Sequence, residues 1–176
     1  MRSKRISRPG RAGSVSRRQD EAARTTSPRG SRRSSPRSGV GRALADASAL
    51  YAIADEDAPT HEACLAAAES GIALSTPILV VAETAYLLAT HLGMEAELRF
   101  VGSLASGDLP LEPVAPSDWL RIAELAGRYR DLRLGTVDAS IIAAAERLGI
   151  RTIFTLDRRR FAVVRPRHVA AFELVP

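Results

Sequence analysis

Cysteine and lysine are nearly absent from this chain of 176 residues. Since Cys64 is the only cysteine, neither a disulfide nor a thiolate metal site can form within one chain. Its setting in EACLAAAES predicts a small buried residue on a helix. The only lysine is Lys4 and no GK[ST] motif occurs, which excludes a P-loop nucleotidase. The same scarcity argues against receiver and aspartyl-phosphatase folds, which generally pair their aspartate with a lysine.

Long hydrophobic runs and histidine motifs are also missing. No apolar run reaches membrane-spanning length, and the basic N-terminus lacks the apolar segment of a secretory signal. We therefore expect a cytoplasmic protein with no membrane partner. The three histidines, His61, His91 and His168, lie in unlike contexts without an H-E-x-x-H motif or a triad elbow. We assign no catalytic role to them.

Charge is distributed unevenly along the chain. Residues 1–42 contain thirteen Lys and Arg and two acids, which leaves twelve basic and eighteen acidic residues of the totals of 25 and 20. The pI near 10.3 therefore describes the first segment only. Residues 1–41, rich in Arg, Ser, Pro and Gly, are predicted to be a disordered tail, and residues 42–176 to be one folded domain. The tail is either a nucleic-acid-binding arm or irrelevant to function, and we favour the second.

Short apolar segments alternate with helical patterns from Ala43 onward. Strands are predicted over residues 43–47, 72–75, 111–114, 151–156 and 169–174, and helices over 49–55, 61–70, 77–91, 95–106, from 116 onward and over 136–148. Thr136 is the expected N-cap of the last helix, and Trp119 is an expected core anchor. The alternation predicts an α/β domain with a mainly parallel sheet.

Four acidic residues lie in otherwise apolar segments: Asp46 in ALADASAL, Glu83 in LVVAETAYLL, Asp138 in GTVDASIIAAA and Asp157 in RTIFTLDRR. A buried carboxylate is costly unless its charge is compensated. Mg²⁺ and Mn²⁺ prefer oxygen ligands and are held by a few carboxylates together with substrate phosphate. The four acids therefore predict a Mg²⁺ or Mn²⁺ site suited to phosphodiester chemistry.

The predicted positions of these acids favour one common site. Asp46 and Asp157 lie at the carboxyl ends of predicted strands, where sites form in open parallel sheets. Asp138 lies in the first turn of a helix, where the macrodipole favours negative charge. Taken singly, Asp46 and Asp138 could be local caps, and Asp157 could start a turn. Glu83 could lie on a solvated helix face, but four separate explanations are less economical than one shared cation.

The same segments resemble the PIN-domain family, and specifically the VapC-type toxins of bacterial toxin–antitoxin pairs, over about residues 43–176. LADASALYAI resembles the opening strand with the first acid, and VVAETAYLL, GTVDASIIAAAERLGI and TIFTLDRRRF resemble the segments with the second, third and fourth acids. The resemblance implies a parallel sheet flanked by helices and a Mg²⁺- or Mn²⁺-dependent endoribonuclease. Its catalytic and metal-binding residues would be Asp46, Glu83, Asp138 and Asp157.

Other residues near these acids acquire expected roles from the resemblance. Ser48 and Thr155 are expected to position metal ligands or water. Arg158, Arg159 and Arg160 are candidates for contacts with RNA phosphates, although an ordinary solvated loop explains each of them as well.

The resemblance also implies partners and leaves two other functions open. We expect a transfer RNA or ribosomal RNA substrate, a VapB-type antitoxin and a homodimer. Such toxins usually begin within a few residues of the first strand, so Val40 or a neighbour is the expected natural start. One alternative is a PIN-like module that binds RNA or a partner without cleavage, which would be expected to lose one or more acids. The other is a metal-dependent phosphatase acting on small molecules.

Overall fold

Five short strands form one parallel sheet in the computed structural model, which describes residues 41–176. The strands are β1 (Arg42–Ala45), β2 (Ala73–Pro77), β3 (Leu111–Glu112), β4 (Thr152–Phe154) and β5 (Glu173–Val175), and their order in the sheet is β3-β2-β1-β4-β5. All neighbouring strands run parallel, which confirms the predicted sheet. The tail predicted over residues 1–41 lies, except for Gly41, outside the described residues.

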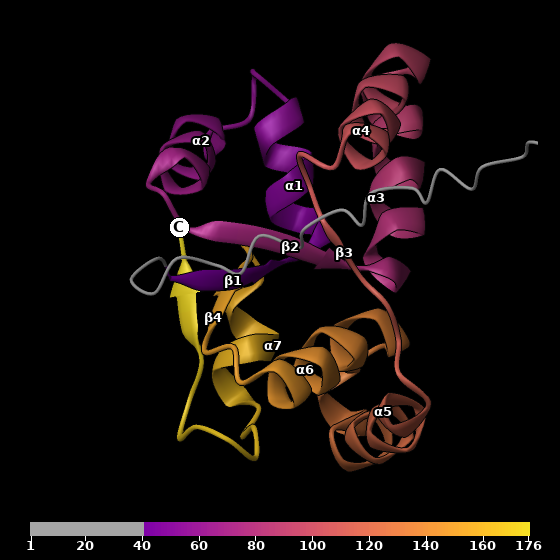
Figure 1. Cartoon of the computed structure of the whole chain (residues 1–176), viewed down its shortest axis with the longest axis vertical. Coiled ribbons are helices and arrows are strands. Elements are labelled where there is room, and N and C mark those ends of the chain that lie inside the picture. The colour runs from indigo at the N-terminus through magenta and orange to yellow at the C-terminus, as the bar shows by residue number, and fades with distance from the viewer. Residues whose placement is uncertain (1–40) are drawn as a thin grey trace, which may run out of the picture. The chain divides into compact units, whose positions relative to one another are not determined.

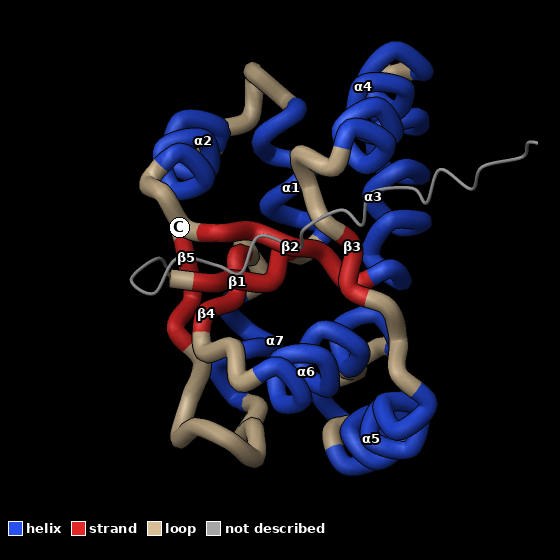
Figure 2. Tube along the Cα trace, viewed as in Figure 1, coloured by secondary structure: helices blue, strands red, loops and turns tan. Residues whose placement is uncertain are grey.

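Helices cover both faces of this sheet. They are α1 (Ala47–Ala54), α2 (His61–Glu69), α3 (Ile78–His91), α4 (Met94–Ser106), α5 (Pro116–Arg128), the 3₁₀ helix η1 (Arg130–Leu132), α6 (Thr136–Leu148) and α7 (Arg158–Val163). The first four helices lie on one face, and α5, α6 and α7 lie on the other (Figures 1 and 2). No helix within residues 41–176 is long and apolar enough to cross a membrane.

The central strand β1 is buried from both sides. Leu44 pairs with Ser75 of β2 and with Ile153 of β4, and Ala43, Leu44 and Ala45 have no exposed surface. Because helices cover both faces, a parallel strand of this kind is apolar along its whole length. The alternating pattern of a half-exposed strand is accordingly absent from β1, and Asp46 is the first polar residue after it.

The helix α6 supplies the core on one face and the third acid. Ile141 and Ile142 are fully buried and belong to the same apolar cluster as Ile153 and Phe154 of β4. Burying side chains of this size stabilises the fold by roughly 1.5–3 kcal/mol each. This packing determines which way α6 faces, and therefore where its first turn places Asp138.

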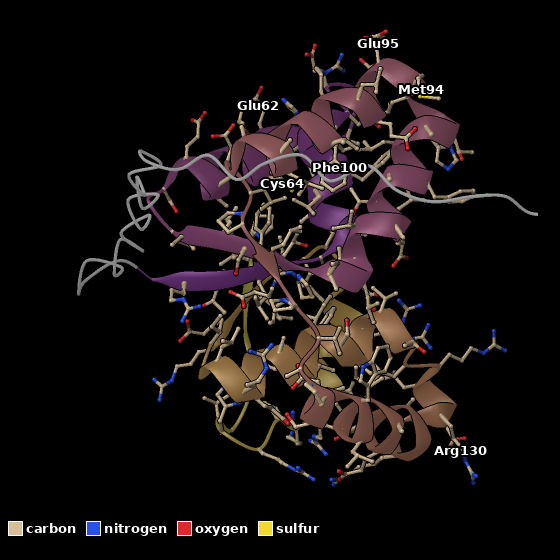
Figure 3. All side chains as sticks on the ribbon, turned by 45° about the vertical axis from the view of Figure 1, so that its right-hand side comes forward. Glu62, Cys64, Met94, Glu95, Phe100 and Arg130 are labelled. Carbon is tan, nitrogen blue, oxygen red and sulfur yellow. The ribbon has the colours of Figure 1, made fainter. Side chains whose placement is uncertain are left out.

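Cys64 is confirmed as a buried helical residue. It lies on α2 with no exposed surface and carries a free thiol, and Figure 3 labels it on the ribbon of that helix.

Several local predictions were wrong. Trp119 is half exposed and not a core anchor, because α5 buries a stripe that includes Asp118 and Arg121, which form ion pairs with α6. Thr136 is the first helical residue of α6, and Gly135 occupies the N-cap position. No helix was predicted after β4, and the segment forms the helix α7 with Asp157 as its N-cap.

Candidate functional site

The acids gather where the strand order of the sheet reverses. From the central strand β1 the chain adds β2 and β3 on one side, and then β4 and β5 on the other. In open parallel sheets, the crevice outside the carboxyl ends of the strands at such a switch point is the usual position of a site. Asp46 immediately follows β1, and its amide donates to the Phe154 carbonyl oxygen at 2.9 Å. Thr76 Oγ1 donates to the Ala45 carbonyl oxygen at 3.1 Å, so both neighbouring strands hold the main chain beside Asp46.

Two hydroxyl groups hold the Asp46 side chain. Ser48 Oγ and Thr155 Oγ1 both donate to Asp46 Oδ2, each at 2.7 Å. The hydroxyls are themselves fixed, because the Leu156 amide donates to Ser48 Oγ at 3.0 Å and the Asp157 amide donates to Thr155 Oγ1 at 3.0 Å. Within residues 41–176 no hydrogen bond reaches Asp46 Oδ1, so this oxygen is available to a ligand. Ser48 and Thr155 therefore hold the Asp46 carboxylate, and their role in orienting a metal ligand stays a prediction.

Asp138 is a buried carboxylate at the start of α6. The Gly135 amide donates to Asp138 Oδ2 at 3.2 Å, as expected for an acid in the first turn of a helix. Burial raises the pKa of Asp138, Arg160 and the Gly135 hydrogen bond lower it, and the charges of Asp46 and Asp157 raise it further. The net pKa of Asp138 is raised, because the compensation from Arg160 and Gly135 is incomplete.

Glu83 reaches the same cleft from α3. Its side chain is exposed to solvent. Partial desolvation nevertheless raises its pKa, the charges of Asp46 and Asp138 raise it further, and Arg160 lowers it. Nearby charges shift a pKa in this way, and Glu83 and Asp138 line the same pocket. The structure therefore brings Asp46, Glu83 and Asp138 together from β1, α3 and α6.

Asp157 joins the cluster through Arg160. Asp157 Oδ1 accepts a hydrogen bond from the Arg160 amide at 3.2 Å, which caps α7. Arg160 Nη1 lies 2.8 Å from Asp157 Oδ2 and 3.4 Å from Asp138 Oδ2. A guanidinium group thus lies between two of the four carboxylates and partly neutralises both.

The carboxylate groups of this cluster are suitable ligands for a hard divalent cation, but the distances between them are too long for a ready metal site. Every acidic donor is a carboxylate, the ligand type that Mg²⁺ and Mn²⁺ prefer, and two of the carboxyl groups have a raised pKa. Yet across residues 41–176 no three His, Cys, Asp or Glu side chains are close enough to form a ready set of metal ligands. Repulsion between carboxylates and the pairing of Arg160 with two of them provide a physical reason for this wider spacing.

The three consecutive arginines face different surroundings. Arg158 donates to the main-chain oxygen of the C-terminal Pro176. Arg159 and Arg160 line a pocket of about 470 Å³ next to Asp157. Arg160 also lines a second pocket of about 330 Å³ that contains Glu83 and Asp138.

Sequence reasoning missed a fourth arginine. Arg133 lines both pockets together with Arg160. It lies in the connection between η1 and α6, where no apolar pattern or acidic motif drew attention to it. The one available signal in the sequence was its position: Arg133 is a basic residue two positions before Gly135, the first residue of the segment GTVDAS.

Fold and cleft together define an α/β protein with an acidic site at the switch point of its sheet. Comparison with known proteins is more specific. The sequence profile of the PIN-domain family matches residues 43–165, and the chain belongs to the PIN-domain family.

Two proteins of Mycobacterium tuberculosis illustrate the relationship. The chain is 37% identical over 134 residues to Ribonuclease VapC26, an alignment that covers 76% of this chain and 99% of that protein. The crystal structure of VapC20, described as a sarcin-ricin loop cleaving toxin, aligns with a TM-score of 0.62 at 21% identity and covers 65% of this chain and 89% of that chain. The second likeness concerns the fold alone.

Proposed function

We propose that this protein is a divalent-metal-dependent endoribonuclease and the toxin of a type II toxin–antitoxin pair. The observation that carries the proposal is the convergence of Asp46, Glu83 and Asp138 at the switch point of the sheet in a PIN-domain chain. The ribonuclease name of the relative with 37% identity supports RNA as the substrate. A module that only binds RNA has no need for these carboxylates, and the raised pKa values of Glu83 and Asp138 indicate a cost in the absence of a cation.

Each part of the cleft has a role in this proposal. Asp46, Glu83 and Asp138 would hold Mg²⁺ or Mn²⁺, and Asp157 would hold Arg160 and contribute negative charge. When bound, the metal would lower the pKa of a water molecule and neutralise charge on the phosphate and the leaving oxygen. Ser48 and Thr155 keep Asp46 Oδ2 fixed, and Oδ1 would be the oxygen available to the metal. Arg159 and Arg160 supply positive charge where an acidic domain would otherwise repel RNA.

The expected partners are part of the same proposal. A toxin of this class would be neutralised by a VapB-type antitoxin, would act on transfer RNA or ribosomal RNA in the cytoplasm, and would form a homodimer. Coexpression with the product of the neighbouring gene, followed by copurification and loss of RNA cleavage, tests the antitoxin.

The experiment for the function compares three full-length proteins: wild type, Asp46→Asn and Asp57→Asn. Asp57 lies in an exposed turn, so its variant controls for the loss of one negative charge. With millimolar Mn²⁺ or Mg²⁺ we expect the wild type and the control to cleave single-stranded RNA, and Asp46→Asn to lose at least about a hundredfold in rate. EDTA should stop all cleavage.

Thermal melting separates the alternatives in the same samples. A metal that binds only the folded state stabilises it by about 2.7 kcal/mol at a hundred times its Kd, and Asp46→Asn should lose most of the resulting shift. RNA binding without cleavage at any metal concentration would favour the non-catalytic module. Release of phosphate from small phosphomonoesters, with RNA left intact, would favour the phosphatase.

A further inference from the structure

Arg133 has a backbone conformation that arginine rarely adopts. Its φ and ψ are 55° and 41°, in the left-handed region, and it ends the short helix η1. For a residue with a Cβ this conformation costs roughly 1–2 kcal/mol. The other residues of 41–176 with positive φ are all glycines: Gly71, Gly93, Gly107 and Gly149. The chain thus uses glycine at each other left-handed position that the structure describes, and an arginine here.

Arg133 lies on the boundary between two pockets. The larger pocket, of about 470 Å³, is lined by Asp131, Leu132, Arg133, Asp157, Arg159 and Arg160. The smaller, of about 330 Å³, contains the acids Glu83 and Asp138. Since Arg133 and Arg160 line both, the larger pocket directly adjoins the acidic cleft.

The charges in the larger pocket do not cancel. Asp157 is paired with Arg160 at 2.8 Å, and Asp131 is fully exposed and lies 3.8 Å from Arg130, which points away into solvent (Figure 3). Neither Arg133 nor Arg159 forms an ion pair with another residue of 41–176. Two guanidinium groups therefore remain available to an anion, next to Asp157 and to the pocket of Glu83 and Asp138.

We infer that this pocket binds a phosphate group of the RNA next to the scissile one, with Arg133 and Arg159 as its ligands. This inference rests on the proposed function, since it assigns a subsite to the same cleft. A guanidinium group presents paired N–H donors that match phosphate oxygens. A single-stranded backbone with one phosphate in the acidic cleft places the next phosphate beside it, where the two arginines offset the repulsion from the carboxylates.

The test measures binding of a fluorescent ten-nucleotide single-stranded RNA to the full-length protein in EDTA, over a range of salt concentrations. Arg133→Gln is compared with Arg130→Gln, which removes the same charge three residues away but outside the pocket lining. Arg133→Lys keeps the charge without the forked donors. We expect Arg133→Gln to weaken binding about tenfold and to reduce the slope of log affinity against log salt by roughly 0.7. Arg130→Gln should leave the slope unchanged, and Arg133→Lys should keep the slope but lose part of the affinity.

A second probe and a folding control complete the design. The same RNA with uncharged methylphosphonate linkages should bind the wild type and Arg133→Gln equally, because no phosphate charge is left for Arg133. All variants should keep the thermal midpoint of the wild type, since glutamine and lysine incur the same backbone cost as arginine at this position. Equal losses in Arg133→Gln and Arg130→Gln, or a loss that persists with the uncharged probe, would overturn the inference. This binding assay contains no metal and does not depend on cleavage. Failure of the wild type to cleave RNA in the presence of metal would therefore contradict the proposed function, whereas the phosphate-binding inference is judged by the binding assay alone.

Discussion

At the residue scale, the cleft depends on how firmly Asp46 is held. Its carboxylate accepts hydrogen bonds from Ser48 and Thr155, and its main chain is fixed by β4. A ligand held in this way loses little conformational freedom when a metal binds, which is how groups behind a metal ligand raise affinity. Thr155 is the most buried of these groups, with no exposed surface.

Thr155→Val should therefore impair the site without unfolding the domain. The variant removes the donor to Asp46 and the acceptor of the Asp157 amide, so we expect a 10–100-fold loss of metal-dependent activity or metal affinity, about the effect of removing such a group. The unpaired amide should cost roughly 1–3 kcal/mol of stability. Thr152→Val is a matched control, because the Thr152 hydroxyl donates only to exposed Glu173. Affinity for Mn²⁺ from thermal melts is the readout, and an unchanged affinity in Thr155→Val would contradict the role assigned here.

Glu83 leads to a prediction about pH. Its pKa in the folded protein is raised, chiefly by burial and then by Asp46 and Asp138, so the metal-free folded state binds a proton more tightly than the unfolded state does. The contribution of Glu83 to the free energy of unfolding is therefore fully present below its ordinary pKa of 4.5. It is lost as the pH rises through the raised pKa of the folded state. In EDTA at neutral pH, Glu83→Gln should therefore melt at a higher temperature than the wild type. The gain in free energy of unfolding should be less than about 1 kcal/mol, because solvent screens this exposed group.

The difference in melting temperature between Glu83→Gln and the wild type should change with pH and with metal. Below pH 4.5 the two proteins should melt together, and in saturating Mn²⁺ the wild type should be the more stable, because Glu83→Gln lacks a ligand. Glu56→Gln, in an exposed loop, shows the effect of losing one negative charge elsewhere. A midpoint for Glu83→Gln in EDTA that stays below that of the wild type at every pH would rule out the electrostatic cost proposed for the cleft.

At the element scale, buried charges join α5 to α6. Arg121 donates to both carboxylate oxygens of Glu146, each at 2.8 Å, and the two side chains are only 8% and 9% exposed. Asp118 accepts from Arg147 Nε at 3.0 Å in the same interface. These pairs place η1, which follows α5, beside α6, which carries Asp138. The interface therefore sets the position of Arg133 relative to the acids.

Glu146→Gln should destabilise the domain by about 3 kcal/mol, since it leaves the buried Arg121 with only the half-exposed Glu124. The thermal midpoint should fall by roughly 6–12 °C for a chain of this size. Burial by itself raises the pKa of Glu146. Arg121 and the Arg167 amide together lower it by more, so the net pKa is lowered. The contribution of this pair should thus disappear as pH falls through the lowered value. Asp131→Asn breaks the fully exposed pair with Arg130 and should leave the midpoint unchanged; equal shifts in both variants would contradict this account.

At the scale of the whole molecule, charge is divided between the two predicted parts. Residues 1–42 contain thirteen of the 25 Lys and Arg, whereas eighteen of the 20 acids lie in 43–176. Every residue assigned to the cleft lies after residue 41. The division at residues 41 and 42 remains a proposal, and it leads to a direct test.

Deleting residues 1–40 should leave the turnover number of RNA cleavage largely unchanged. The deletion should weaken RNA binding at low salt, and the difference between the two proteins should shrink as salt rises, since it arises from counterion release. Turnover and KM would be measured for a short RNA at low and near-physiological salt. A truncated protein that melts normally but loses nearly all turnover would make the tail part of the enzyme.

The sequence by itself predicted the strands, most of the helices and the four acids proposed for the cleft. Continuous apolar segments such as ALA before Asp46, and helical spacing in the segment of α6, report burial directly, because burial of apolar surface drives their formation. An acid inside such a segment is conspicuous for the same reason. Strand ends were less certain: residues 151–156 were predicted and β4 spans only Thr152–Phe154, since local preference does not determine where pairing stops.

Only the tertiary structure decided which side chains meet. Thr155 reaches Asp46 across 109 positions of the chain, and Arg160 lies between Asp138 and Asp157 through a helix whose formation the sequence pattern did not reveal. Trp119 is exposed because α5 docks on α6 through ion pairs, although its spacing suggested an apolar face. Spacing along a chain describes the faces of single elements, whereas the choice of contacts depends on how those elements pack. Arg133 acquires its position from that packing alone.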